Sequence, residues 1–169
     1  MTIGARDPRP APGAFPDAAA RWAALRDSSG PLGTAELDAL WARLAPVDAI
    51  DILGQWRGFA LSTGHRLEKV LAHSRWYGKR FVALDDVQPL LCVGENGELF
   101  SDVQAGRGEA SLWNVEFRGE VTATMIYDGM GVLDHFKRVD DRTLMGIMNG
   151  KPGLVLDGGK HFYFGLERA

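Results

Sequence analysis

The chain has 169 residues, 46% of them apolar, which is the length of one domain with a short extension and enough apolar material for a core. Its 19 basic and 22 acidic residues give a formal net charge of −3. Because no Lys/Arg cluster stands out either, nucleic acid is not expected as a partner. Cys92 is the only cysteine, which excludes an internal disulfide and favours a reducing compartment.

Neither end of the chain carries a recognisable targeting or membrane segment. The first residues lack the apolar core of a signal peptide, and no stretch approaches the ~20 apolar residues that a membrane-spanning helix needs. We therefore expect a cytoplasmic protein with no integral membrane segment. Prolines at positions 8, 10, 12 and 16 favour extended backbone, so residues 1–16 are interpreted as a flexible tail.

Residues 17–53 are predicted to form two or three short helices. Asp17 can cap the first of these, and Pro31 lies just beyond its end. The second helix has apolar residues at helical spacing, at positions 37, 40, 41 and 44. Such a stripe is typical of a helix that packs on the outside or at the end of a sheet.

The sequence pattern changes at Gly54. From Gln55 to Ser62 large apolar residues alternate with small and polar ones, which predicts a first strand. Leu67, Val70 and Leu71 then recur at helical spacing, so one amphipathic helix is expected after this strand, in a position where it can act as a lid.

The rest of the chain is predicted to form strands joined by tight turns such as Asn96-Gly97 and Asp128-Gly129. With the first strand, the count is about nine or ten. The expected strands cover residues 79–84, 89–93, 98–103, 112–118, 120–127, 131–139, 143–149, 154–156 and 161–167.

Successive antiparallel strands without crossover helices favour a mainly β fold. Closure would remove the exposed edges of a long open sheet, so we expect a closed antiparallel up-and-down β-barrel. The expected organisation is a tail over residues 1–16, a helical segment over 17–53 and the barrel over 54–169. An apolar ligand inside the barrel is a common use of this architecture.

Several motifs together resemble a known family. They are Gly54-Gln55-Trp56-Arg57-Gly58, Thr63-Gly64-His65, residues 76–81 (WYGKRF), residues 134–141 (DHFKRVDD) and residues 162–164 (FYF). The chain is similar to the bacterial family labelled by a Gly-x-Trp-x-x-Gly motif and followed by a domain of unknown function. Gly58 stands two residues after Trp56, whereas that label places the second glycine three residues after the tryptophan.

The resemblance implies a calycin-like barrel, as in lipocalins and fatty-acid-binding proteins, and it implies binding of a fatty acid or similar small hydrophobic molecule. In calycins a basic residue of the last strand lies across the entry tryptophan. Arg168 is the matching candidate, and stacking on Trp56 would contribute ~0.5 to 2 kcal/mol. We therefore interpret Gly54, Trp56, Gly58 and Arg168 as structural.

A lipid-like ligand needs an apolar lumen and one or two polar groups that fix its head group. The predicted lumen residues are Met125, Tyr127, Met148 and Phe164, although methionines also fill ordinary cores. For a carboxylate head group, Arg80 and Arg138 are preferred to Lys79 and Lys137, because a guanidinium binds a carboxylate through two parallel hydrogen bonds. Strand alternation allows only one member of each basic pair to face inward, and a solvated exterior position is the alternative for each.

The motifs of known cofactor enzymes are absent. The four histidines form no Cys/His cluster and no helical metal pair, so no metal is expected. No phosphate loop, dinucleotide fingerprint or Gly-x-Ser-x-Gly elbow occurs, so no cofactor is expected.

His135 supports an alternative reading as the acid/base of a cofactor-independent isomerase, lyase or hydrolase that acts on a lipid or terpenoid substrate. Asp134 cannot serve as its partner, since neighbours on a strand face opposite sides. The side chain that pairs with His135 can instead be Tyr127, Asp128 or Asn149 from the adjacent strands. A buried structural histidine is the competing interpretation, and a barrel filled by its own aromatic side chains remains a third.

Overall fold

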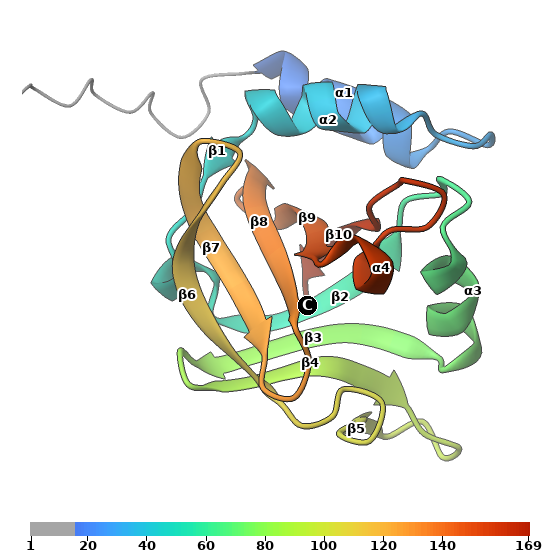
Figure 1. Ribbon diagram of the computed structural model, residues 1–169, viewed down its shortest axis with the longest axis vertical. Coiled ribbons are helices and arrows are strands. Elements are labelled where there is room, and N and C mark those ends of the chain that lie inside the picture. Colours follow the sequence, from blue (N-terminus) through green and yellow to red (C-terminus); the bar gives the residue numbers. More distant parts are fainter. Residues whose placement is uncertain (1–15) are drawn as a thin grey trace, which may run out of the picture.

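The computed structural model describes residues 16–169 (Figure 1). The tail expected over residues 1–16 lies outside the described residues, except for Pro16, which begins the first helix. The protein is mainly β, with ten antiparallel strands and four α-helices in its described part. No helix among residues 16–169 is long and apolar enough to cross a membrane.

The N-terminal segment forms helices, as its apolar spacing predicts. Helix α1 spans Pro16–Arg26 and α2 spans Thr34–Arg43, and a single 3-10 turn, η1, covers Ala49–Ile52. Between α2 and η1 lies a two-residue strand, β1 (Ala45–Pro46), which pairs with a later strand. The sheet therefore takes in residues before Gly54, where the barrel was expected to begin.

The remaining strands alternate along the chain with short connections. Their bounds are β2 Gly54–Ala60, β3 Trp76–Ala83, β4 Asp86–Val93, β5 Leu99–Ser101, β6 Ala110–Phe117, β7 Glu120–Tyr127, β8 Val132–Asp140, β9 Thr143–Gly150 and β10 Tyr163–Arg168. Two further helices interrupt them, α3 (Arg66–His73) after β2 and α4 (Pro152–Val155) after β9.

The strand pairings form a ring in the order β8-β7-β6-β4-β3-β2-β10-β9, because β9 pairs with β8 as well as with β10. Each long strand thus lies beside the next one along the chain, and β2 meets β10. The join between β4 and β6 is the shortest, with Val87 opposite Ala110 and a hydrogen bond of 2.7 Å from the Leu112 amide to the Leu84 carbonyl. In Figure 1, α1 and α2 lie together across one end of this ring.

One element differs in type from its prediction. Residues 154–156 were expected as a short strand, but Pro152–Val155 is a helical turn. Pro152 explains the difference, because its fixed φ favours the first turn of a helix. The N–H groups of that turn have no acceptor within the helix, so the N–H that proline lacks is not needed there. The apolar run that follows is too short for its periodicity to distinguish strand from helix.

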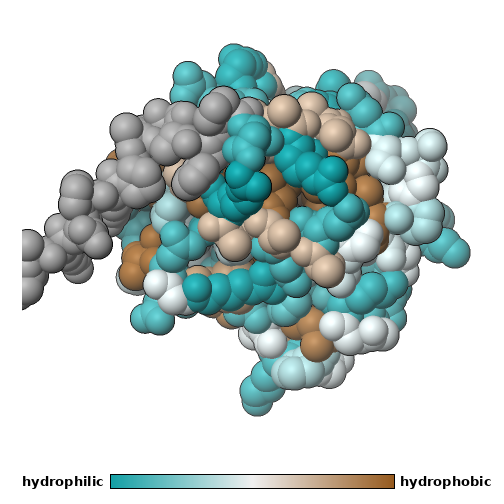
Figure 2. Space-filling view, turned by 90° about the horizontal axis from the view of Figure 1, so that it is seen from above, coloured by the Kyte–Doolittle hydropathy of each residue, from teal (hydrophilic) through white to brown (hydrophobic). Residues whose placement is uncertain are grey.

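Two apolar cores share the sheet between them. One lies within the ring of strands and includes Trp56, Phe81, Phe136 and Phe164. The other lies between the outer face of the sheet and the N-terminal helices, and its members are Ala18, Trp22, Leu25, Leu37, Leu40, Trp41, Leu44, Leu61, Met145, Ile147 and Tyr163. Several strands are therefore buried on both faces. Figure 2 looks onto the end of the molecule that α1 and α2 cover, where hydrophilic residues lie beside mildly hydrophobic ones.

The glycine-tryptophan motif packs two larger side chains against the backbone of β2. Gly54 has φ +129°, and a Cβ there would lie 2.8 Å from the Arg168 guanidinium. Arg168 itself lies 4.3 Å over the Trp56 ring, whose indole N–H donates to the Ile52 carbonyl at 2.8 Å. A Cβ on Gly58 would lie 2.2 Å from the Trp76 ring. Both glycines are required by close approach of a side chain.

Candidate functional site

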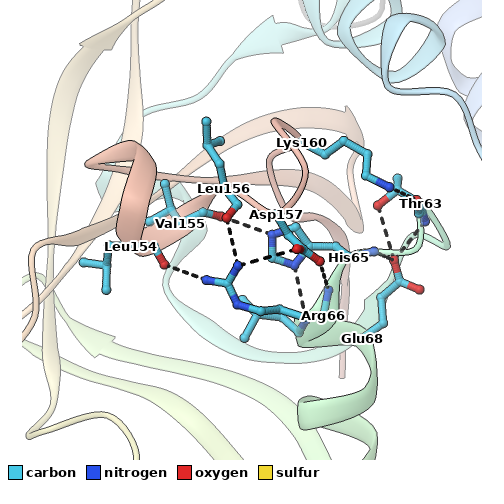
Figure 3. Close-up of polar contacts among 10 residues, drawn as sticks. Thr63, His65, Arg66, Glu68, Leu154, Val155, Leu156, Asp157 and Lys160 are labelled. Carbon is cyan, nitrogen blue, oxygen red and sulfur yellow. Dashed lines mark hydrogen bonds and ion pairs between the residues drawn. The ribbon is translucent and has the colours of Figure 1, made fainter.

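Helix α3 begins with a capping arrangement that fixes its position beside the sheet (Figure 3). His65 Nδ1 accepts a hydrogen bond of 3.2 Å from the Leu67 amide, and Glu68 Oε1 accepts one of 2.8 Å from the His65 amide. These two contacts satisfy backbone donors that a helix start would otherwise leave unpaired. With Nδ1 accepting, Nε2 carries the proton and donates to the Val155 carbonyl at 3.1 Å.

Arg66 continues the connection between α3 and α4 (Figure 3). Its guanidinium donates to the Leu156 carbonyl at 2.8 Å and to the Leu154 carbonyl at 3.0 Å. Its amide donates to Asp157 Oδ2 at 2.7 Å. The start of α3 is therefore held against the β9–β10 connection through four contacts, counting His65. The rest of α3 has no buried residue.

A cavity of about 280 Å³ lies between α3 and the strands, and we call it the α3 cavity. Its wall is mostly apolar, which follows from the helical stripe of α3 and the inward faces of the strands. The larger apolar side chains that line it are Leu67, Val70, Leu71, Trp76, Leu90, Met130, Val132, Met148, Leu154, Phe162 and Phe164. Val70 is 54% exposed, which places the apolar side chain of this helix at the mouth of the cavity.

A buried ion pair also faces the α3 cavity. Lys79 of β3 and Asp134 of β8 both line it, with Nζ 2.9 Å from Oδ2 and side chains only 3% and 4% exposed. Lys79 Nζ donates in addition to the Pro89 carbonyl at 3.2 Å. An ammonium has three N–H donors and a carboxylate two oxygens, so these contacts leave one donor and Oδ1 for another partner.

Two further polar groups lie in the same wall. Tyr127 has its ring 5.7 Å from Lys79 Nζ, and burial together with the charge of Asp134 raises the pKa of its phenol well above the usual value. The phenol therefore stays protonated and can donate a hydrogen bond. The Trp76 indole N–H is buried and has no acceptor among the described residues. The nitrogen is not accessible from the cavity, and the Trp41 indole N–H in the outer core is also buried without an acceptor in the described part of the chain, so the lining role of Trp76 is that of its apolar ring.

The structure brings three of the predicted lumen residues to the α3 cavity. Tyr127, Met148 and Phe164 all line it. Met125 is not among the lining residues: it is fully buried in the core within the ring, directly opposite Asp134 in the pairing of β7 with β8. The histidine at the strand-to-helix corner, His65, is the cap of α3.

His135 lies on the opposite face of β8 from Asp134 and does not reach the cavity. Its ring stacks on Phe117 with centroids 4.0 Å apart, and its nitrogens lie 2.8 Å from Thr124 Oγ1 and 3.0 Å from Asn149 Nδ2. Burial, then the charges of Arg118 and His161, lower its pKa to about 4. These contacts describe a neutral, fully hydrogen-bonded side chain, so the structure supports the structural interpretation of this histidine.

The two predicted head-group arginines also lie away from the cavity. The Arg80 guanidinium donates to Gln55 Oε1 at 2.9 and 2.7 Å and to Gln88 Oε1 at 3.0 Å. Arg138 is partly exposed and lies 3.9 Å from Asp141. Of the first basic pair it is the other member, Lys79, that faces inward.

Asp134 and Trp76 were not predicted as site residues, Lys79 was ranked below Arg80 as a head-group residue, and the helix now seen as α3 was expected as a lid without named contacts. A signal for Asp134 exists, since it alternates with Val132 and Phe136 on one face of β8. A carboxylate on an apolar strand face indicates a buried partner or a functional group. The part of the chain that the structure describes contains no group of three or more His, Cys, Asp or Glu arranged to hold a metal ion.

Comparison with known proteins gives two adjoining family matches. The model described as GXWXG protein matches residues 39–97, and a domain of unknown function (DUF4334) matches residues 108–168. The first description places one residue between the tryptophan and the second glycine, as in Gly54, Trp56 and Gly58. The wider spacing expected from the sequence was wrong, and the chain fits the motif without a departure.

A solved structure is also similar. The crystal structure of a protein from Thermomonospora curvata has a TM-score of 0.78 to this chain and 38% sequence identity, and the match covers 90% of this chain and 99% of the other. The comparison with curated proteins gives no match. None of the matched descriptions states an activity.

Proposed function

The chain belongs to the family in which a GXWXG segment is followed by the DUF4334 domain, and we propose that it binds a small hydrophobic molecule in the α3 cavity. The observation that carries the proposal is the buried Lys79–Asp134 pair in a mostly apolar cavity. Ligand sites typically combine an apolar wall with a few polar groups that fix the orientation of the ligand. A volume of about 280 Å³ favours a compact molecule.

The charges around the cavity favour a neutral ligand over the fatty-acid carboxylate expected from the sequence. Lys79 is the basic residue in the wall, and Asp134 already pairs with it, while Asp102 adds a second carboxylate. A bound carboxylate would bring one more negative charge into this setting without a free cation, which costs several kcal/mol. A carbonyl or hydroxyl oxygen instead accepts hydrogen bonds from Tyr127 or from the remaining N–H of Lys79 at no charge penalty.

The arrangement of the strands and of α3 also supports ligand binding in the α3 cavity. We propose that the ring of strands is a closed barrel of the calycin kind, with α3 as the lid over its ligand. Two observations favour this: each ring strand pairs with two neighbours, and α3 is attached at its N-terminal end while its remaining residues are not buried. The acid/base role considered for His135 is not part of the proposal, because that side chain lies outside the cavity.

The binding proposal is tested with two molecules of nearly the same shape, cyclohexyl methyl ketone and cyclohexanecarboxylate. Protein carrying ¹³C-labelled methionine methyl groups is titrated with each, and NMR shifts are followed. Met130 and Met148 line the cavity, whereas Met145 lies in the outer core between the sheet and the N-terminal helices. We expect the ketone to shift the first two signals and to bind at least tenfold more tightly than the carboxylate.

The control in this experiment is internal. If the ketone shifts the Met145 signal as much as those of Met130 and Met148, binding is non-specific and the proposal fails. A preference for the carboxylate would contradict the charge argument and return the fatty acid as the ligand. Native mass spectrometry of freshly purified protein adds an independent check for a copurified neutral molecule.

A further inference from the structure

We infer that Asp134, Lys79 and Tyr127 catalyse proton transfer at the carbon next to the carbonyl group of a small neutral ketone or aldehyde. The inference rests on the proposed function, because it requires the ligand to occupy the α3 cavity. It adds a reaction to binding and assigns it to three side chains that come from three strands, β3, β7 and β8.

Asp134 is the base. Its side chain lines the cavity, and the contact with Lys79 engages Oδ2, so Oδ1 is the oxygen available to a substrate. The ion pair holds the carboxylate in one orientation inside the protein. A fixed carboxylate in a mostly apolar cavity is a suitable acceptor for a carbon-bound proton, and general bases of this kind contribute about 10²- to 10⁴-fold to rate.

The donors that would stabilise the negative oxygen formed in this step are also present. Tyr127 keeps its proton, and Lys79 has one N–H left after its contacts with Asp134 and the Pro89 carbonyl. A substrate carbonyl oxygen is the acceptor that these groups lack, and one such donor typically contributes about 10²- to 10³-fold.

The reaction balances without a cofactor. The C–H bond next to the carbonyl breaks as the proton moves to Asp134, the C–H electrons form a carbon–carbon double bond, and the carbonyl π electrons move to the oxygen. When the carbonyl reforms, Asp134 returns the proton to the same carbon or, in a β,γ-unsaturated ketone, to the γ carbon. The second outcome is isomerisation to the conjugated ketone, with no change in composition.

The test measures exchange of carbon-bound hydrogen in D₂O with cyclohexyl methyl ketone as the probe. Loss of its proton NMR signals next to the carbonyl reports proton transfer, and the methionine methyl signals of Met130 and Met148 report binding in the same sample. We expect wild-type protein to accelerate exchange at least 100-fold over the protein-free rate. Tyr127→Phe should lower this rate 10- to 100-fold while binding persists, because only a donor is lost.

Asp134→Asn should abolish the acceleration, and Asp141→Asn, which changes an exposed carboxylate, should leave it unchanged. If Asp134→Asn does not fold, the result for Tyr127→Phe decides, since removal of one hydroxyl preserves the packing. Methyl shifts without accelerated exchange would overturn the inference and leave the binding proposal standing. Absence of shifts at Met130 and Met148 would overturn both.

Discussion

Lys79 and Asp134 form a buried ion pair that a contribution to stability does not explain. Removing two charges from water costs several kcal/mol for each ion, and the mutual attraction of a buried pair often does no more than offset that cost. Both side chains are almost fully buried, in a wall that is mostly apolar. An apolar pair of the same volume would fold at least as well, so the pair is better explained by a ligand.

Because the two buried charges depend on each other, a single substitution should lower the free energy of unfolding and a double substitution should restore it. Lys79→Met leaves Asp134 buried without its partner and should lower the free energy of unfolding by about 3–5 kcal/mol. The double variant Lys79→Met/Asp134→Leu should recover most of that loss and still fail to bind cyclohexyl methyl ketone. Urea unfolding and the Met148 methyl signal measure the two effects. A double variant as unstable as the single one would show that the pair stabilises the fold.

His135 predicts a pH dependence of stability that is separate from the site. Its pKa is about 4 in the folded protein against an ordinary value near 6.5. Between these values the unfolded chain binds the proton and the folded protein does not, so stability falls as the pH is lowered through this window, by roughly 3 kcal/mol in total.

The measurement compares unfolding in urea at pH 7 and pH 4.5. His135→Gln should remove this part of the pH dependence, whereas His73→Gln, at an exposed position of α3, should leave it intact. If the free energy of unfolding of His135→Gln fell between pH 7 and pH 4.5 as much as that of the unchanged protein, other groups would be responsible. The environment of His135 would then be more hydrated than its contacts indicate.

At the scale of elements, the GXWXG motif on β2 is connected to the cavity through the first residue of β3. Gly58 leaves room for the Trp76 ring, and Trp76 in turn forms part of the cavity wall. Gly54 does the same for Arg168, at the other end of the motif. The motif is architectural, yet one of its glycines determines where a cavity side chain lies.

Gly58→Ala should therefore weaken both stability and binding. A methyl group at this position overlaps the Trp76 ring, and relief of such overpacking typically costs about 1–3 kcal/mol. Displacement of the indole should also weaken ketone binding, as read from the Met148 methyl shift. Gly30→Ala is the matched control, because nothing lies within 4 Å of a Cβ there. If Gly58→Ala bound the ketone as tightly as the unchanged protein, the motif would not determine the structure of the cavity wall.

Helix α3 predicts a local rather than a global response. Arg66→Ala removes the two guanidinium contacts to the Leu154 and Leu156 carbonyls. Amide hydrogen exchange over residues 67–71 should become faster, while the free energy of global unfolding changes by about 1 kcal/mol or less, since the side chain is half exposed. Lys69→Ala, an exposed change on the same helix, should alter neither. If the amides of residues 67–71 exchanged as slowly in Arg66→Ala as in the unchanged protein, these contacts would not hold α3.

For the whole molecule, strand order and number follow from the sequence because most of the sheet obeys simple alternation. Strand β7 has the predicted bounds, Glu120–Tyr127, since a Gly-containing turn precedes it and Asp128-Gly129 follows it. The short elements were less predictable. Strand β1 exists through pairing with β8, which no local pattern indicates, and α4 depends on Pro152.

The site was harder to predict than the fold, for two physical reasons. β8 is buried on both faces through its middle residues, so burial alone does not decide between Asp134 and His135, and the alternation of Asp134 with Val132 and Phe136 is the one signal that favours Asp134. In β3 the pairing with β4 shifts register on both sides of Gly78, which breaks the alternation that would place Lys79 rather than Arg80 inward. Tyr127, Met148 and Phe164 lie on strands without such interruptions.

The central claim is that the α3 cavity binds a neutral molecule whose oxygen is held by the polar groups of its wall. A crystal structure of the protein soaked with cyclohexyl methyl ketone tests it most directly. We expect the ketone inside the cavity, with its oxygen within hydrogen-bond distance of Tyr127 or Lys79. Binding elsewhere, or a ketone whose oxygen points toward the mouth between Val70 and Leu154 instead of toward these donors, would contradict it.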